Sequence, residues 1–326
     1  MREVQEPVLT QRAPSRSQQS YRHEALLWHT PEDFTDALAG FVGEGLDAGE
    51  PVMVAVTPEH TAWLQEALGE SAVREVRFVD MMSLGQNPAR IIPAWREFVD
   101  AQSAGRGPVR GIGEPIWPGR HQEELLECQL HEALLNVAID PSTPLWLICP
   151  YDAASLEPEV LEEAQRSHPV MVEAGTHRGS AHYVGGPHAN ALFGAGLSEP
   201  RGRPQVATYS ADTIHRLLAY AKLELWITGL SIDQAGHLAA ATELLARGSL
   251  HRGATEVSIR IWSDPDAVIC EVSDDAPVSD PLHGRSLPVD EHEGLWRVNQ
   301  ACDLVQLRSA EGRTIVRILT WRRANP

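Results

Sequence analysis

Lysine is almost absent from this chain of 326 residues, and cysteine is scarce. Lys222 is the single lysine, so arginine carries nearly all of the positive charge. Aspartate and glutamate outnumber lysine and arginine by 45 to 27, which gives a formal net charge of −18. A surface that binds nucleic acid needs clustered basic residues to neutralise phosphates. This balance opposes nucleic acid as a partner and favours a solvated acidic surface.

The four cysteines form no metal or disulfide pattern. Cys128, Cys149, Cys270 and Cys302 are scattered, and no CxxC pair occurs. This spacing favours buried, reduced thiols over disulfides or a zinc site. The sequence also has no apolar run of membrane-spanning length and no apolar signal core near its start. We therefore predict a cytoplasmic protein that has no membrane partner.

Two common motifs are missing. No GxxxxGK[ST] loop follows the first predicted strand, where the residues at 29–33 read HTPED instead, so nucleotide binding by a P-loop is excluded. No GxSxG motif occurs, which removes the usual nucleophile of an α/β hydrolase.

The length of the chain predicts two domains, because a single core seldom extends beyond roughly 250–300 residues. Residues 1–20 lack apolar periodicity and are predicted to form a mobile arm. We predict a first domain at 21–184, a linker rich in glycine and proline at 185–205, and a second domain at 206–326.

Short apolar runs alternate with helical patterns in the first domain. This alternation is typical of a layered α/β fold with a mostly parallel sheet. The predicted strands are 24–28, 51–57, 76–80, 109–113 and 145–149, and the predicted helices are 30–48, 59–67, 87–104, 121–138 and 157–167.

Six segments of the first domain carry a family resemblance: HEALLW at 23–28, FVGEGLDAGEPV at 41–52, NPARIIP at 87–93, GIGEPIW at 111–117, CQLHEALLN at 128–136 and CPYD at 149–152. They resemble the MEDS sensory domain of methanogen and methylotroph regulators. The strand order is also similar to that of the RecA and KaiC class of α/β domains. The resemblance implies that the first domain senses a small molecule.

The carboxyl edge of the predicted sheet supplies candidates for the sensed ligand. In an open parallel sheet, ligands bind beyond the carboxyl ends of the strands. The candidate residues end or follow the predicted strands: His29, Thr57, His60, Glu114, Trp117, Tyr151 and Asp152. An aromatic ring, a tyrosine hydroxyl and a carboxylate at one rim suit a small organic molecule.

The predicted helix at 121–138 carries three residues that could bind a metal ion. Glu127 and His131 are four residues apart, and Cys128 and His131 are three apart, so the three side chains share a helix face. A solvated Glu–His pair beside a core cysteine is the more common arrangement. We therefore predict no metal ligands.

The second domain begins with two predicted helices, at 211–228 and from Ser231 to about 250. Strands at 256–262 and 267–272, a polar loop at 274–293, a helix at 294–301 and a hairpin of 304–308 with 314–321 follow. The run GLWRVNQ at 294–300 is its most specific segment. With EVSD at 271–274 and RTIV at 313–316, it resembles the histidine-kinase-like ATPase domain of anti-sigma serine-protein kinases, a Bergerat-type α+β sandwich.

This second resemblance implies a nucleotide site. It places Asp274 at the adenine amino group, Thr314 beside that aspartate, Gly294 at the start of the helix on the phosphate side, and Gly248 where the family has its magnesium-binding asparagine. The phosphate end departs from the family pattern, because glycines are replaced by Ala276, Glu291, His292 and Glu293. Phosphoryl transfer depends on positioning and on metal-assisted charge stabilisation. We therefore predict a degenerate site without catalytic residues, at which ATP or ADP is not required and binds weakly at most.

The two resemblances together predict a cytoplasmic regulator of transcription. A sensory domain would act on a catalytically inactive, pseudokinase-like anti-sigma domain that binds a protein partner. The resemblance implies a sigma factor or an anti-anti-sigma protein as that partner and leaves a homodimer open. Two alternatives remain: an active serine-protein kinase that binds ATP with magnesium at Asp274 and Thr314, and a ligand-binding protein whose second domain is structural.

Overall fold

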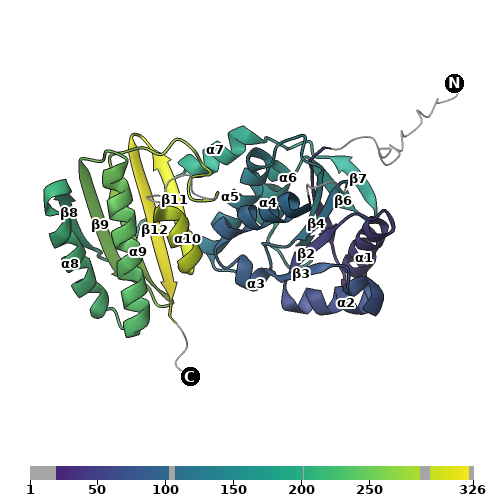
Figure 1. Ribbon diagram of the computed structural model, residues 1–326, viewed down its shortest axis with the longest axis horizontal. Coiled ribbons are helices and arrows are strands. Elements are labelled where there is room, and N and C mark those ends of the chain that lie inside the picture. Colours follow the sequence, from purple (N-terminus) through teal and green to yellow (C-terminus); the bar gives the residue numbers. More distant parts are fainter. Residues whose placement is uncertain (1–19, 103–106, 201, 287–293, 323–326) are drawn as a thin grey trace.

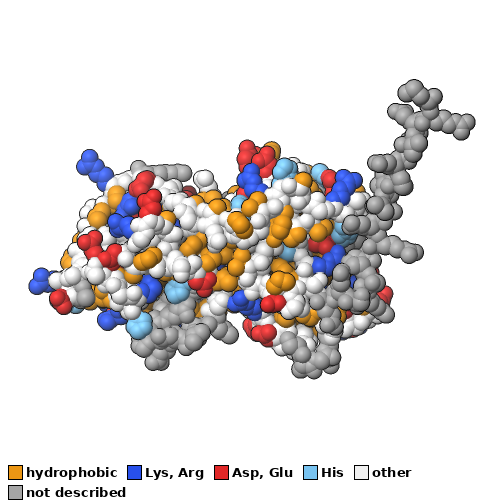
Figure 2. Space-filling view, turned by 90° about the horizontal axis from the view of Figure 1, so that it is seen from above, with side chains coloured by type: hydrophobic (Ala, Val, Ile, Leu, Met, Phe, Trp, Pro, Cys, Tyr) orange, Lys and Arg blue, Asp and Glu red, His pale blue; other side chains and the backbone are white. Residues whose placement is uncertain are grey.

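The computed structural model describes residues 20–102, 107–200, 202–286 and 294–322, which form two layered units joined side by side (Figure 1). The predicted arm at 1–20 lies outside these ranges except for Ser20. Within the described ranges, no helix is both long and apolar enough to cross a membrane. On the face seen in Figure 2, acidic and basic side chains are interspersed rather than gathered by sign.

The first unit is built on a seven-stranded sheet in the order β3-β2-β4-β5-β1-β6-β7. The strands are β1 (Arg22–Trp28), β2 (Val52–Val56), β3 (Arg77–Asp80), β4 (Val109–Gly113), β5 (Leu145–Asp152), β6 (Val170–Glu173) and β7 (Thr176–Gly179). All neighbours pair in parallel except β6 and β7, which are antiparallel. The mixed α/β class is confirmed, whereas β6 and β7 were not predicted because they are short and, in β7, exposed.

Helices cover both faces of this sheet. The helices α1 (Pro31–Asp47) and α2 (Pro58–Val73) lie on one face, and α4 (Ile91–Gln102), α5 (Gln122–Ala138) and α6 (Pro158–Ser167) lie on the other. The short α3 (Met81–Leu84) and the 3-10 turn η1 (Pro88–Arg90) join β3 to α4. Strands β2 and β4 are buried along their whole length, because successive side chains enter opposite helical layers.

The segment predicted as a linker contains a helix, α7 (Gly186–Gly194). Gly185 has a positive φ of 72° immediately before it, and Pro187 lies in its first turn, where proline suits a helix start. In the sequence, the glycine and proline residues of this segment had indicated a loop. Helix α7 packs against α5 and against strand β11 of the second unit, so only residues after it act as a connection.

The second unit is a five-stranded antiparallel sheet in the order β11-β12-β10-β9-β8. Its strands are β8 (Gln205–Ser210), β9 (Glu256–Ser263), β10 (Ala267–Asp274), β11 (Leu304–Ala310) and β12 (Arg313–Trp321). The 3-10 turn η2 (Ala211–Thr213) leads into α8 (Ile214–Trp226), which is followed by α9 (Ile232–His251) and α10 (Gly294–Ala301), and these helices pack their apolar residues on one face of the sheet. The edge strand β8 was not predicted, because its side chains are mostly exposed.

Candidate functional sites

A cavity of about 550 Å³ opens at the carboxyl edge of the parallel sheet. Its wall includes Trp28 at the end of β1, Thr57 directly after β2, and Asp152 at the end of β5. Trp117, four residues past β4, and Trp63 on α2 add two more aromatic side chains. The volume lies within the range of about 300–1,000 Å³ that is usual for small-molecule sites. The cavity is therefore large enough for a small organic ligand.

A buried carboxylate–imidazole pair lies at this cavity. Glu114 is 2% exposed, and its Oε1 lies 2.7 Å from Nδ1 of His60. The backbone N–H of Thr57 donates to the other carboxylate oxygen at 3.1 Å. The hydroxyl of Thr57 accepts from the backbone N–H of His60 at 3.3 Å and so caps α2. With Nδ1 held by Glu114, the orientation of the His60 ring is fixed.

The predicted rim residues divide into three groups. Thr57, His60, Trp117 and Asp152 all line the cavity, and Glu114 bonds two of them. His29 is exposed and lies 3.3 Å from Glu173 on β6, away from the lining. Tyr151 is buried on the opposite face of the sheet, where its ring meets His168 edge-on at 5.6 Å. Adjacent residues of a strand point to opposite faces, so Asp152 at the cavity requires Tyr151 to lie away from it.

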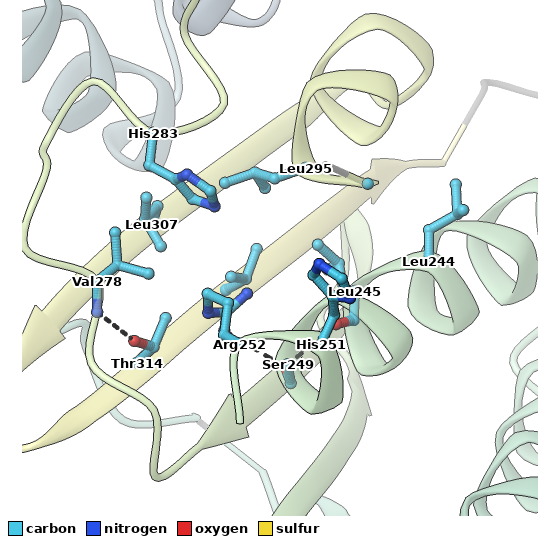
Figure 3. Close-up of a pocket in the computed structure, with 13 residues that line it drawn as sticks. Leu244, Leu245, Ser249, His251, Arg252, Val278, His283, Leu295, Leu307 and Thr314 are labelled. Carbon is cyan, nitrogen blue, oxygen red and sulfur yellow. Dashed lines mark hydrogen bonds between the residues drawn. The ribbon is translucent and has the colours of Figure 1, made fainter. Parts of the chain in front are cut away.

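A second, smaller cavity of about 200 Å³ lies in the antiparallel unit, between α9, α10 and the sheet. Figure 3 shows Leu244, Leu245 and Ser249 on α9, facing Val278 and His283 on the loop opposite. The wall is largely apolar. Its volume is below the usual range for small-molecule sites.

The residues of the predicted nucleotide site are brought together here. Gly248, Gly294 and Thr314 line the cavity, and Asp274 lies beside it. One carboxylate oxygen of Asp274 accepts from the hydroxyl of Ser249 and from Nη2 of Arg252, each at 2.6 Å. Its acceptor capacity is therefore largely used within the protein.

Thr314 and Gly294 also have partners within the fold. The hydroxyl of Thr314 donates to the carbonyl of Ala276 at 2.8 Å and accepts from the N–H of Val278 at 3.1 Å (Figure 3). A Cβ added at Gly294 would lie 3.0 Å from the carbonyl oxygen of Leu244. Glycine at 294 thus allows α10 to approach the backbone of α9. Glu291, His292 and Glu293, which were expected to replace glycines of the nucleotide site, lie outside the described residues.

The two units meet in a polar and well-bonded contact. The side-chain N–H of Asn87 donates to the carbonyl of Asn299 at 3.0 Å, and Nε of Arg90 donates to the same oxygen at 2.8 Å. Glu127 on α5 lies 2.7 Å from guanidinium nitrogens of both Arg285 and Arg308. These contacts tie η1 and α5 to α10 and β11.

The three residues that shared a helix face do not converge on one point. Glu127 pairs with the two arginines, the thiol of Cys128 donates to the carbonyl of Pro115 at 3.2 Å, and burial lowers the pKa of His131 to about 3. The groups that do converge are His23, Glu132, Cys149 and His168, all buried, with ligand atoms within 4.8 Å of one another. Burial, helped by the nearby His168, lowers the pKa of His23. These four residues are spread over 146 positions and form no spacing motif, so this cluster could not be predicted from the sequence.

Comparisons with known proteins address the first unit. Residues 22–169 match the model of the MEDS family, the methanogen/methylotroph, DcmR sensory domain. No curated protein matches the chain. The matched residues span β1 to α6 and contain the cavity at the sheet edge, and they end before the antiparallel unit. The parallel-sheet part of this chain is thus similar to the MEDS sensory domain, which indicates a role in sensing and signalling.

Proposed function

We propose that this protein is a signalling regulator whose parallel-sheet domain binds a small organic molecule at the carboxyl edge of its sheet. The cavity of about 550 Å³ within the MEDS-like segment carries this proposal. Three tryptophans, Trp28, Trp63 and Trp117, supply apolar walls, and His60 supplies a hydrogen-bonding group held by Glu114. A compact molecule with an apolar body and one polar group fits this lining best.

The wall of the cavity is continuous with the contact between the two domains. Met82 on α3 lines the cavity, and four residues later the side-chain N–H of Gln86 donates to Asp303 at 3.2 Å. Trp117 also lines the cavity, and the guanidinium carbon of Arg120 lies 3.7 Å from the centroid of its ring. Next to Arg120, the ring of His121 stacks on Trp321 at 4.2 Å. Ligand binding that shifts either segment would therefore reach the antiparallel domain directly.

The antiparallel domain is proposed as the output module. The order of its elements supports a Bergerat-type, anti-sigma-like sandwich for this domain. For the parallel-sheet domain, we propose a RecA/KaiC-like topology. The internal bonds of Asp274 and the cavity of about 200 Å³ favour protein binding over phosphoryl transfer. Exposed apolar residues at the turn between α8 and α9 offer a surface for such a partner: Leu223, Trp226, Ile227 and Ile232. A sigma factor or an anti-anti-sigma protein is the partner that the family resemblance implies.

Ligand binding is tested on the full chain with phenol, benzyl alcohol and cyclohexanol as probes. Tryptophan fluorescence and calorimetry should show saturable binding, because three tryptophans line the cavity. His60→Ala should weaken the binding at least about tenfold, which corresponds to about 1.4 kcal/mol. His29→Ala is the matched control, since His29 is exposed and outside the lining. Equal effects of the two substitutions would refute the site.

The nucleotide alternative is tested by calorimetry with ATP and magnesium. We expect no tight binding, because Arg252 and Ser249 already bond Asp274. Tight magnesium-dependent binding that Asp274→Asn abolishes would replace the partner-binding proposal with a serine-protein kinase.

A further inference from the structure

Four side chains from four elements converge inside the parallel-sheet domain, away from the cavity. His23 lies on β1, Glu132 on α5, Cys149 on β5, and His168 directly after α6. Each residue is at most 2% exposed. Oε2 of Glu132 lies 3.0 Å from Nε2 of His23, 3.2 Å from Nε2 of His168 and 3.4 Å from Sγ of Cys149. Sγ of Cys149 lies 3.5 Å from Nε2 of His23.

The hydrogen bonds around the two histidines fix the position of their protons. The side-chain N–H of Asn136 donates to the carbonyl of Ser167 at 2.7 Å, so its Oδ1 faces Nδ1 of His23 at 3.1 Å as an acceptor. Nδ1 of His168 faces the carbonyl of Ala164 at 2.8 Å, which can only accept. Both Nδ1 atoms therefore carry hydrogen, and in the neutral rings both Nε2 lone pairs point toward the cluster.

In the neutral form, this arrangement places electron-rich atoms side by side. Two imidazole lone pairs beside a carboxylate oxygen repel each other unless a positive charge lies between them. Two imidazolium rings with centroids 4.1 Å apart, both buried, would also repel. Within the described part of the chain, Oε1 of Glu132 is buried without a hydrogen-bond partner, and Nε2 of His168 has only the 3.2 Å contact with Oε2 of Glu132. Buried polar groups rarely remain unpaired in a complete structure.

We propose that His23, Glu132, Cys149 and His168 bind one zinc ion. Zinc in proteins takes four nitrogen, sulfur or oxygen ligands at about 2.0–2.3 Å in a tetrahedron, whose edges are then roughly 3.3–3.8 Å long. Four of the six separations, at 3.0, 3.2, 3.4 and 3.5 Å, are close to such edges, and all six lie within 4.8 Å. A glutamate and a cysteine thiolate carry two negative charges, which a divalent ion neutralises.

Zinc is the ion that the donor set and the surroundings favour. Imidazole and thiolate donors in a tetrahedron select zinc over magnesium or calcium, which prefer oxygen ligands. The bonds from His23 to Asn136 and from His168 to Ala164 are the outer contacts that orient metal-bound histidines. With four protein ligands and no exposed position, the site is structural. It fixes α5, the helix that also carries Glu127 into the domain contact.

The test uses the full chain, purified from zinc-supplemented medium without a metal-affinity step. Elemental analysis should find about one zinc per chain, and its removal by a chelator should lower the melting temperature, which added zinc restores. Cobalt(II) added to the metal-free chain should give visible d–d bands and a thiolate-to-cobalt charge-transfer band. Zinc binding should also release protons, because the buried Cys149 thiol must ionise.

Substitutions separate the ligands from other buried residues. His168→Gln should reduce zinc affinity at least tenfold, and Cys149→Ser should abolish the charge-transfer band. Cys270→Ser is the control, because Cys270 is a buried thiol of the other domain that contacts Thr242. If a ligand variant fails to fold, the proton release and cobalt spectrum of the unsubstituted chain still decide. A chain without zinc that zinc neither binds nor stabilises, or a Cys149→Ser variant with an unchanged cobalt spectrum, overturns the proposal.

Discussion

Replacing Glu127 by glutamine should weaken the contact between the two domains. Glu127 is fully buried, and its two oxygens each lie 2.7 Å from an arginine of the antiparallel domain. Arg285 and Arg308 are 3% and 7% exposed in their side chains, so water can compensate little for a lost partner. Burial lowers the pKa of Arg285, whereas the charge of Glu127 raises it.

The expected loss follows from leaving two buried cations without their carboxylate. Removing one partner of a buried ion pair costs about 3–5 kcal/mol. Because glutamine keeps the shape of glutamate, the effect would arise from charge rather than from a cavity. We therefore expect Glu127→Gln to lower the free energy of unfolding of the full chain by about 3 kcal/mol or more.

Urea denaturation, followed by tryptophan fluorescence, measures this loss. Limited proteolysis reports in parallel on the connection at 195–200, which should be cleaved faster when the domains separate. Glu162→Gln is the matched control, since Glu162 also faces an arginine, Arg166, at 3.8 Å but is exposed. An exposed pair contributes about 0–1 kcal/mol. A Glu127→Gln variant no less stable than this control would show that the buried pair does not hold the domains together.

Three further outcomes are expected. Burial raises the pKa values of three thiols to about 12: Cys128, Cys270 and Cys302. In the folded chain at pH 8, these thiols should therefore react with a disulfide reagent about a thousandfold more slowly than in denaturant. Fast reaction of any of them in the folded chain would contradict this expectation. Gly111→Ala should lower stability by about 1–3 kcal/mol, because the added Cβ would lie 2.7 Å from the Trp95 ring, and thermal denaturation against Gly40→Ala, where nothing lies within 4 Å, tests it. Ser231→Ala should cost about 1 kcal/mol by removing the capping box of α9, measured by urea denaturation, and an unchanged midpoint would refute that role.

The parallel-sheet site could be predicted in part from a general rule of sheet geometry. Thr57, His60, Trp117 and Asp152 follow or end parallel strands, and the carboxyl ends of such strands meet at one edge. The prediction that Tyr151 lies at the ligand site was wrong, because the rule identifies the edge of the sheet but not the face on which a side chain lies. Alternation along β5 separates it from Asp152.

The antiparallel domain shows a different limit of sequence reasoning. Gly294 and Thr314 line one cavity and Asp274 bonds its wall, although Asp274 and Thr314 lie on strands of the sheet and Gly294 begins a helix. Their bonds to Arg252 and Ser249, and the close approach of α10 to α9, depend on side-chain packing that no motif encodes.

The sequence by itself determined the alternating architecture and the edge at which a ligand cavity opens, since the periodicity of apolar residues and the residues that follow each strand are local properties. The tertiary structure alone decided which distant residues meet. His23, Glu132, Cys149 and His168 became a candidate zinc site only when β1, β5, α5 and α6 packed together. Glu127 became part of the domain contact only when the second sheet supplied Arg285 and Arg308. Such pairings depend on how elements close in three dimensions, and the spacing of residues along the chain does not record this.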